Sequence, residues 1–369
     1  MKTLILSAST GQGHNSCAEA IQECFEAHGD LCVIEDAFGL VSKKLSRSIA
    51  KNHEKTYRQT PKLSNASYRF LENHPGLFSR KQIVYQVMSI GGRQISQCIC
   101  KGGYDTVLCT HVLAAMSLTA AIQRDKLPVK SAFIATDYSC SPGMNGTHMD
   151  RYFIPHASLI DAFRKAGVDE ASIIPVGIPV KSAYRFPHDR KAAKASFGVQ
   201  PDKRHLLIMC GSMGCGPIPE LLNALSSHLP VQWEITVVCG TNKELKARLE
   251  KEHASPGIHI QGYVKEMPLL LASADLYLTK PGGLSTSEAF AAGVPMVLVD
   301  AVAGCEENNL RHFVNIGAAV TGENPHEVIQ VCLELMDDSR KLDSMTQHLH
   351  QLSRGNPAEQ IWQEMNRSR

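Results

Sequence analysis

Three glycine-rich stretches in this chain carry residue types that could hold a phosphate group. They occupy residues 11–14, 210–216 and 280–288, and each comes directly before a predicted helix. Glycine lets the backbone approach a ligand closely, and a helix N-terminus favours negative charge. The second and third stretches also contain serine or threonine hydroxyls, so we expect these two to bind a diphosphate. The first is the weaker signal, because Ser16 stands where a dinucleotide-binding fingerprint has its third glycine.

The stretch at residues 280–288 allows two interpretations of its carboxylate, Glu288. This residue lies one turn into the predicted helix, where it could accept hydrogen bonds from the hydroxyls of a ribose. The spacing Ser285-x-x-Glu288 also fits a capping box, which needs no ligand. One carboxylate cannot serve both purposes well, so the two interpretations compete.

Residues suited to proton transfer occur in the first half of the chain. His14 ends the first glycine stretch, and imidazole titrates near neutral pH, as a general base should. Asp137 follows a predicted strand and could orient His14 or an acceptor hydroxyl. A helix-start histidine and a loop-capping carboxylate are the simpler interpretations. We interpret His111 and His148 as structural or exposed.

Positive charge is concentrated in residues 41–101. This segment has twelve Lys and Arg against two Glu, a net charge of +10, whereas the whole chain carries +2. Near residues 77–93 apolar residues alternate with cations, which suits a surface helix or flap over anionic lipid headgroups. A core-packed helix with a basic outer face is the alternative. Signatures of DNA or RNA binding are absent from the sequence, so we expect no nucleic-acid partner.

The glycine stretches must be positioned by alternating strands and helices. Ten short apolar strands are predicted at residues 3–6, 31–34, 106–109, 132–135, 152–154, 205–209, 235–238, 258–260, 276–278 and 296–299. Helical stretches separate them, which indicates parallel sheets with helices on both faces. A chain of 369 residues is expected to form two domains. We place them at residues 1–177 and 205–354, joined by a linker at 178–204.

The composition is that of a globular protein, with 43% hydrophobic and 20% charged residues. We expect no signal peptide and no membrane span, because the apolar stretches are too short. The twelve cysteines are scattered and lack the spacing of a zinc site. We therefore expect buried thiols in a reducing cytoplasm, and no metal.

Taken together, these motifs resemble the monogalactosyldiacylglycerol synthase and processive diacylglycerol glucosyltransferase family. The resemblance covers residues 3–338 and depends on the order and spacing of short stretches. These are residues 11–14, 135–138, 176–180, 240–242, 262–264, 280–289 and 293–295, and the pattern Gly304-x-Glu306-x-x-Asn309. The family implies a GT-B fold, in which two doubly wound Rossmann-like α/β domains face a central cleft. The first binds the lipid acceptor and the second the UDP-sugar, and a C-terminal helix at 355–369 is expected to pack back on the first.

The resemblance also implies roles for individual residues. His14 would deprotonate the acceptor hydroxyl, with Asp137 assisting, and Glu288 would hold the ribose. The uracil, the diphosphate and the donor sugar would be bound by Gly13, Gly211, Ser212, Met213, Gly214, Val264, Pro281, Gly282, Gly283, Thr286, Glu306 and Asn309. Contacts to membrane and acceptor would come from Phe78, Arg80, Lys81, Tyr85 and Arg93.

The implied reaction is an inverting transfer of a hexose from UDP-glucose or UDP-galactose to diacylglycerol, giving a β-glycosyldiacylglycerol. It implies no metal or other cofactor, and a peripheral enzyme on the cytoplasmic face of the membrane. Relatives carry Gln where Cys305 stands here, and a thiol bonds sugar hydroxyls more weakly than a carboxamide, so the donor sugar stays open. The alternatives are N-acetylhexosamine transfer to a polyprenyl-linked acceptor, a UDP-sugar 2-epimerase, and a UDP-sugar-binding protein without turnover.

Overall fold

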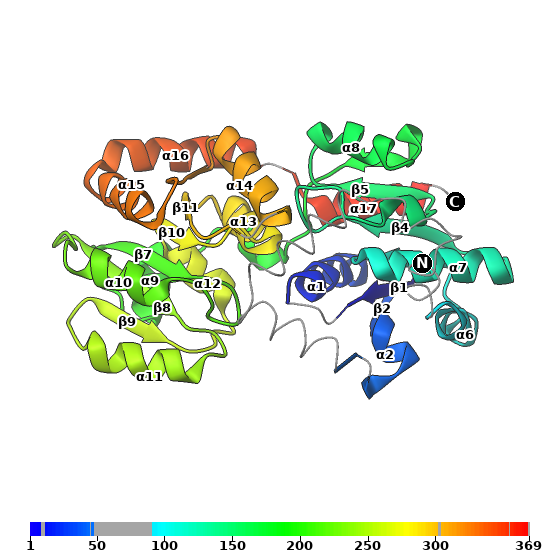
Figure 1. Ribbon diagram of the computed structural model, residues 1–369, viewed down its shortest axis with the longest axis horizontal. Coiled ribbons are helices and arrows are strands. Elements are labelled where there is room, and N and C mark those ends of the chain that lie inside the picture. Colours follow the sequence, from blue (N-terminus) through cyan, green and yellow to red (C-terminus); the bar gives the residue numbers. More distant parts are fainter. Residues whose placement is uncertain (9–11, 45, 48–90, 302–303, 354, 368–369) are drawn as a thin grey trace. The chain divides into compact units, whose positions relative to one another are not determined.

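The chain forms two compact units. The computed structural model describes residues 1–8, 12–44, 46–47, 91–301, 304–353 and 355–367. The first unit is built from Met1–Lys181 and the C-terminal stretch Gly355–Arg369, and the second from Ser182–Ala301 and Glu306–Arg354. Each unit contains a six-stranded parallel sheet, drawn in Figure 1. This agrees with the two α/β halves expected from the sequence.

The sheet of the first unit has the strand order β2-β1-β3-β4-β5-β6. Its strands are β1 (Lys2–Ser7), β2 (Leu31–Asp36), β3 (Thr106–Cys109), β4 (Lys130–Ile134), β5 (Arg151–Ile154) and β6 (Ile173–Pro175). The central strands are continuous apolar runs: Leu4, Ile5 and Leu6 of β1 are fully buried. Such runs are typical of parallel strands that helices cover on both faces. The three-residue edge strand β6 was not predicted from the sequence.

Helices of the first unit are α1 (Gln12–Ala27), α2 (Ala37–Val41), α6 (Gly92–Gly102), α7 (Val112–Asp125), α8 (Ile160–Lys165) and α17 (Pro357–Arg367). The last of these comes from the far end of the chain. Lys130 Nζ donates to the Met365 carbonyl at 3.1 Å, and Arg151 Nε lies 3.0 Å from Glu364 Oε1. These contacts hold α17 on the first unit.

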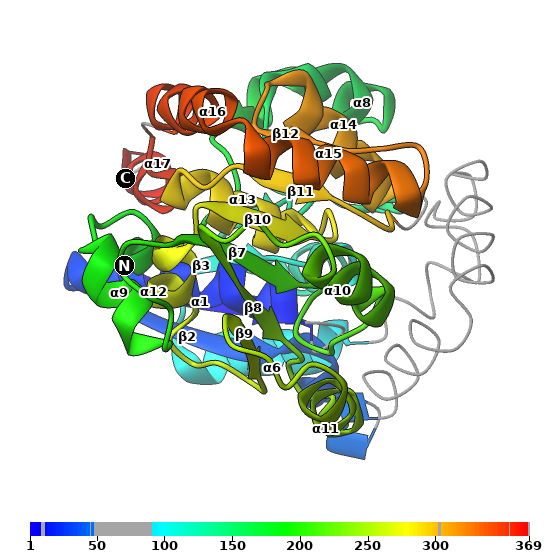
Figure 2. The ribbon, with the colours of Figure 1, turned by 90° about the vertical axis from the view of Figure 1, so that its left-hand side faces the viewer.

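The sheet of the second unit has the strand order β12-β11-β10-β7-β8-β9, and Figure 2 shows it from the side. Its strands are β7 (Arg204–Met209), β8 (Trp233–Val238), β9 (Ile258–Gln261), β10 (Leu276–Thr279), β11 (Met296–Leu298) and β12 (Ala319–Val320). Counted within the unit, this is the order 3-2-1-4-5-6 of dinucleotide-binding sheets. The order reverses between β7 and β10, and ligands bind at the carboxyl side of such a point.

Helices of the second unit are α9 (Arg190–Ser196), α10 (Ile218–Ser226), α11 (Lys243–Glu252), α12 (Met267–Ser273), α13 (Gly283–Ala292), α14 (Cys305–Asn315), α15 (Pro325–Asp337) and α16 (Ser339–Leu352). The stretch 178–204, which the sequence analysis assigned to a linker, contains α9 and the short 3-10 helix η5 (Ser182–Tyr184). Both lie within the second unit, which begins at Ser182. The polar surface of α9 conceals a buried side, formed by Ala193 and Lys194.

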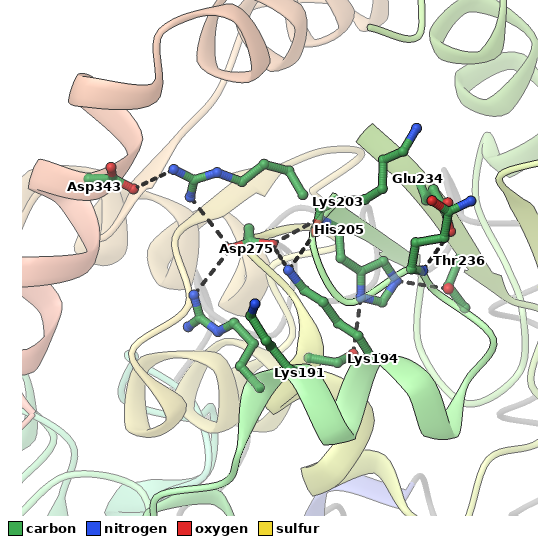
Figure 3. A network of polar contacts seen from close by, with 12 residues as sticks. Lys191, Lys194, Lys203, His205, Glu234, Thr236, Asp275 and Asp343 are labelled. Carbon is green, nitrogen blue, oxygen red and sulfur yellow. Dashed lines mark hydrogen bonds and ion pairs between the residues drawn. The ribbon is translucent and has the colours of Figure 1, made fainter. Parts of the chain in front are cut away.

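Lys194 belongs to a buried polar network at the amino end of the second sheet (Figure 3). Its Nζ lies 2.8 Å from Asp275 Oδ2, and both side chains are almost fully buried. Arg190 and Arg204 approach the other oxygen of Asp275, at 3.1 and 3.4 Å. The backbone N–H of His205 donates to Asp275 at 2.9 Å. The network therefore ties α9 to β7 and β10, at the end of the sheet opposite to the glycine loops.

Candidate functional site

The first unit places His14 at the point where its strand order reverses. His14 lies in the first turn of α1, directly after β1, and its Nδ1 is 2.7 Å from the carbonyl oxygen of Thr110 and 3.1 Å from Oγ1 of Thr136. Thr110 follows β3 and Thr136 follows β4, and β1, β3 and β4 are neighbours in the sheet. Three carboxyl ends of strands therefore converge on one imidazole.

These contacts fix the tautomer of His14. A carbonyl oxygen can only accept a hydrogen bond, so Nδ1 carries the proton and the lone pair is on Nε2. Burial lowers the pKa of His14 from its usual value of 6.5, and the bond to Thr110 opposes that shift only in part. The ring is therefore neutral at pH 7, the state in which a histidine can accept a proton.

Two threonines contact the ring of His14 at Nδ1, namely Thr110 through its carbonyl and Thr136 through its hydroxyl. The sequence predicts that Asp137 orients His14 or an acceptor hydroxyl, and this role stays a prediction. Asp137 directly follows Thr136 and is half-buried. The two threonines could have been identified from the sequence, because each is the first polar residue after an apolar strand. His111, which directly follows Thr110, has a structural role. Its Nδ1 accepts a hydrogen bond from the Leu113 N–H at 3.1 Å and so caps α7.

Two loops flank the reversal point of the second sheet. One begins at Gly211 after β7, and the other contains Gly282 after β10. A Cβ added at either glycine would meet no atom within 4 Å, so open space adjoins the backbone at both. Helix α13 starts at Gly283, and its N-cap Gly282 has no side-chain capping bond. Together they form the kind of surface that accepts a phosphate at a helix N-terminus.

Gly214, in the first of these loops, has a different role. Its φ is +59°, and a Cβ there would lie 2.1 Å from the carbonyl oxygen of Cys239. The N–H of Thr241 donates to the Ser212 carbonyl at 3.0 Å, which joins the loop after β7 to the loop after β8. Gly214 thus lets the loop pack against the end of β8, and Ser212 contributes its backbone. The carbonyl oxygen of Met213, between Ser212 and Gly214, accepts a hydrogen bond from the Cys215 thiol at 3.9 Å.

Gly214→Ala should lower stability, whereas Gly282→Ala should weaken ligand binding. The first forces a side chain against backbone, so we expect it to lower the free energy of unfolding by about 1–3 kcal/mol. The second adds a methyl group in open space, so it should leave stability unchanged while weakening the UDP binding that the resemblance implies for this loop. Urea unfolding and calorimetric titration with UDP on both variants measure the two effects. Equal stability of the two variants would contradict the packing role of Gly214.

The hydroxyls of the third glycine stretch are not directed as expected. Oγ1 of Thr286 donates to the Gly282 carbonyl at 2.8 Å, and Oγ of Ser287 donates to the Gly283 carbonyl at 2.7 Å. Both side chains are buried within the helix packing. Backbone N–H groups at the start of α13, rather than the Thr286 hydroxyl, are therefore the donors available to a phosphate here.

The structure excludes the capping-box interpretation of Glu288. The N-cap of α13 is Gly282, so Ser285 and Glu288 both lie inside the helix. Glu288 is instead hydrogen-bonded to the phenol of Tyr184, in η5. Burial, and then the charge of Glu288, raise the pKa of Tyr184 well above its usual value. The phenol therefore stays protonated and donates a hydrogen bond to Glu288. Tyr184 was not predicted as a site residue, because the sequence around it contains no recognisable motif.

Lys280 is a buried cation beside the second loop. Its Nζ lies 3.3 Å from Asp300 and 4.0 Å from Glu306. Asn309 is fully buried and donates from Nδ2 to the Pro281 carbonyl at 2.9 Å. Glu306 and Asn309, both on α14, therefore hold the loop in place. From the resemblance, Glu306 and Asn309 are predicted to lie beside the donor sugar, whereas neither Lys280 nor Asp300 has a predicted role.

The remaining predicted residues belong to one unit or the other, or lie outside the described residues. Val264 is half-buried, just after β9, and Gly13 lies within α1. Arg93 is exposed on α6. Phe78, Arg80, Lys81 and Tyr85 lie outside the described residues. Among the residues that are described, no helix is long and apolar enough to cross a bilayer.

Two family models match the chain, one in each half. The model of monogalactosyldiacylglycerol (MGDG) synthase matches residues 14–180, and that of the glycosyltransferase family 28 C-terminal domain matches residues 205–361. The chain is also similar to enzymes named processive diacylglycerol beta-glucosyltransferase. That of Staphylococcus carnosus is 28% identical over 95% of this chain and 88% of its own length. That of Bacillus licheniformis is 25% identical over 97% of this chain and 92% of its own.

Solved structures share the fold. MurG of Acinetobacter baumannii has a TM-score of 0.65 at 16% identity, over the full length of both chains. Anabaena HepE in complex with UDP-glucose has a TM-score of 0.61 at 15% identity, over 100% of this chain and 99% of its own. A putative UDP-N-acetylglucosamine 2-epimerase of Listeria monocytogenes also scores 0.61, at 14% identity over 94% and 90% of the two chains. The two-domain GT-B fold is confirmed, and since an epimerase shares it, the fold alone does not select a reaction.

Proposed function

Because this chain belongs to the monogalactosyldiacylglycerol synthase and processive diacylglycerol glucosyltransferase family, we propose that it transfers a hexose from a UDP-sugar to diacylglycerol. The product is a β-glycosyldiacylglycerol and UDP. The observation that carries this proposal is the neutral imidazole of His14, whose tautomer leaves the Nε2 lone pair to accept a proton. A binding protein without turnover has no need for a base that activates an acceptor hydroxyl.

In the proposed mechanism His14 takes the proton of the diacylglycerol hydroxyl. The hydroxyl oxygen forms a bond to the anomeric carbon as the bond from that carbon to the β-phosphate oxygen breaks, which inverts the configuration. UDP leaves with the electron pair of the broken bond. Its charge is stabilised by the N-terminus of α13 and by Lys280, so the transfer step requires no metal. Asp137 assists on the acceptor side.

The second unit is proposed to hold UDP through Glu288. The carboxylate accepts from the ribose hydroxyls while Tyr184 fixes its orientation. Gly211 and Gly282 face the diphosphate, and the backbone near Val264 faces the uracil. Glu306 and Asn309 hold the loop near the donor sugar. UDP-glucose and UDP-galactose are both proposed donors, because Cys305 replaces the carboxamide that would recognise sugar hydroxyls.

Glu288→Gln should weaken UDP binding by about 10- to 100-fold, as expected for loss of hydrogen bonds to a charged group. The wild type should bind UDP more tightly than 2′-deoxy-UDP, whereas the variant should bind both nucleotides with similar affinity. Calorimetric titration with both nucleotides measures this difference. Glu244→Gln, which changes an exposed carboxylate on α11, serves as the control. Unchanged discrimination in Glu288→Gln would show that the ribose is bound elsewhere.

The membrane is proposed to be reached through the basic segment at residues 41–101. Its net charge of +10 favours anionic headgroups, and attachment would be peripheral. The cytoplasmic face is the proposed location, because nucleotide sugars are made in the cytoplasm. Binding to vesicles should fall steeply with ionic strength if charge drives it.

Reconstitution on liposomes tests the reaction. Vesicles with diacylglycerol and an anionic lipid are offered UDP-glucose, UDP-galactose and UDP-N-acetylglucosamine separately, and glycolipid and free UDP are measured. We expect glycolipid with one or both hexoses, in equal amount to UDP, and none in vesicles without diacylglycerol. Tight UDP binding without glycolipid from any donor would overturn the diacylglycerol proposal. Product on a polyprenyl-linked acceptor alone would favour N-acetylhexosamine transfer instead.

A further inference from the structure

Three potential metal ligands that the transfer mechanism does not use meet at the carboxyl end of α1. Cys24 and His28 are four residues apart, one helical turn, and Glu359 is contributed by α17. The three come together in the fold although more than 330 residues separate Glu359 from the other two. No spacing rule applied to the sequence could find such a set. His14 begins the same helix, about 15 Å away along its axis.

The distances among the three donor atoms approach those of a tetrahedral site. Cys24 Sγ is 3.6 Å from Glu359 Oε2, His28 Nε2 is 2.8 Å from the same oxygen, and all three atoms lie within 4.8 Å of one another. Zinc bond lengths in a tetrahedron give about 3.5 Å between sulfur and oxygen, and about 3.3 Å between nitrogen and oxygen. The His28–Glu359 pair must open by about half an ångström to admit the ion.

Neighbouring side chains already orient two of these ligands. The ring of His28 stacks on Trp362, with centroids 3.7 Å apart and planes 9° from parallel. The indole Nε1 of Trp362 donates to Asp30 Oδ2 at 2.8 Å. Gln363 Nε2 donates to Glu359 Oε1 at 3.1 Å, on the oxygen that does not face Cys24 and His28. Supporting bonds of this kind hold ligands in metal sites.

The electrostatic environment favours a cation at this place. The carboxyl end of a helix is its negative pole, which basic side chains usually offset. The last turn of α1 contains no Lys or Arg, whereas Glu23 and Glu26 lie near it in the sequence. Glu359 adds a further carboxylate from α17. A divalent ion would therefore compensate negative charge on both helices.

We propose that Cys24, His28 and Glu359 bind one zinc-type divalent cation, with water as the fourth ligand. Binding forms metal–sulfur, metal–nitrogen and metal–oxygen bonds, and the thiol proton is released to solvent. The ion fastens the C-terminal helix α17 to the end of α1. Its role is structural, and the proposal stands or falls independently of the reaction at His14.

Cobalt titration of the full-length protein, with its cysteines kept reduced by a phosphine, tests the site. We expect one equivalent of Co²⁺ to give a thiolate charge-transfer band in the near ultraviolet and intense tetrahedral bands in the visible, and one equivalent of Zn²⁺ to remove them. Cys24→Ser should abolish the charge-transfer band, and His28→Asn should weaken zinc binding at least tenfold. Cys100→Ser, which changes an exposed cysteine on α6, should behave as wild type.

Two results would overturn the proposal. One is a wild-type protein that shows no saturable charge-transfer band, which would mean that His28 and Glu359 form an ion pair only. The other is a band that persists unchanged in Cys24→Ser. Zinc should also raise the melting temperature of the wild type and not that of His28→Asn. Far-ultraviolet circular dichroism of each variant verifies that it is folded before the comparison is made.

Discussion

His14→Ala should lower kcat/KM for glycosyl transfer by about a thousandfold, the usual size of a general-base contribution. UDP affinity should stay close to that of the wild type, because the glycine loops proposed to bind UDP belong to the second unit. Steady-state rates on diacylglycerol vesicles and calorimetric titration with UDP provide the two measurements. His148→Ala, which changes an exposed histidine of the same unit, is the matched control and should retain activity.

The pH profile supplies an independent check on His14. Burial lowers its pKa, so the ring stays neutral down to a pH below 6.5. Protonation removes the lone pair, and kcat/KM should therefore fall on the acid side with a midpoint below that value. An acid limb centred above pH 6.5 would mean that another group is the base. A large loss of UDP binding in His14→Ala would likewise show that its role has been misassigned.

Asp275→Ala should lower the free energy of unfolding by about 3–5 kcal/mol. The substitution removes the partner of Lys194, which is almost fully buried and would be left as an uncompensated cation. It also removes the acceptor of the His205 N–H. Urea unfolding followed by circular dichroism measures the loss. At a temperature where the variant remains folded, UDP affinity should be unchanged, because Asp275 lies at the opposite end of β10 from the glycine loop.

Asp202→Ala is the matched control for this prediction. Asp202 also pairs with a lysine of α9, Lys191, at 2.7 Å, but both side chains are exposed. Exposed pairs contribute little, so the unfolding midpoint should not change measurably. Replacing Lys194 by Met in the Asp275→Ala background should recover part of the loss, since it removes the stranded charge. Equal midpoints for Asp275→Ala and Asp202→Ala would mean that Lys194 reaches solvent when its partner is removed.

The sequence by itself determined the two sheets and the position of the glycine-rich loops. Strands such as β7 and β10 are continuous apolar runs followed by glycine, and this pattern is local, so it can be read without knowing the fold. Short edge strands such as β12 carry too little of the pattern to be found. Helix α9 was predicted to be part of a linker, because only two of its residues, Ala193 and Lys194, are buried.

Only the tertiary structure decided which partners each site residue has. The strand order brings Thr110 and Thr136 to His14, across 96 and 122 residues of sequence. The start of α13 at Gly283 rules out a capping role for Glu288 and leaves its carboxylate to Tyr184. The same folding brings Glu359 to Cys24 and His28. Hydrogen bonds and metal ligation depend on distances of a few ångströms, and between residues far apart in the chain only packing sets those distances.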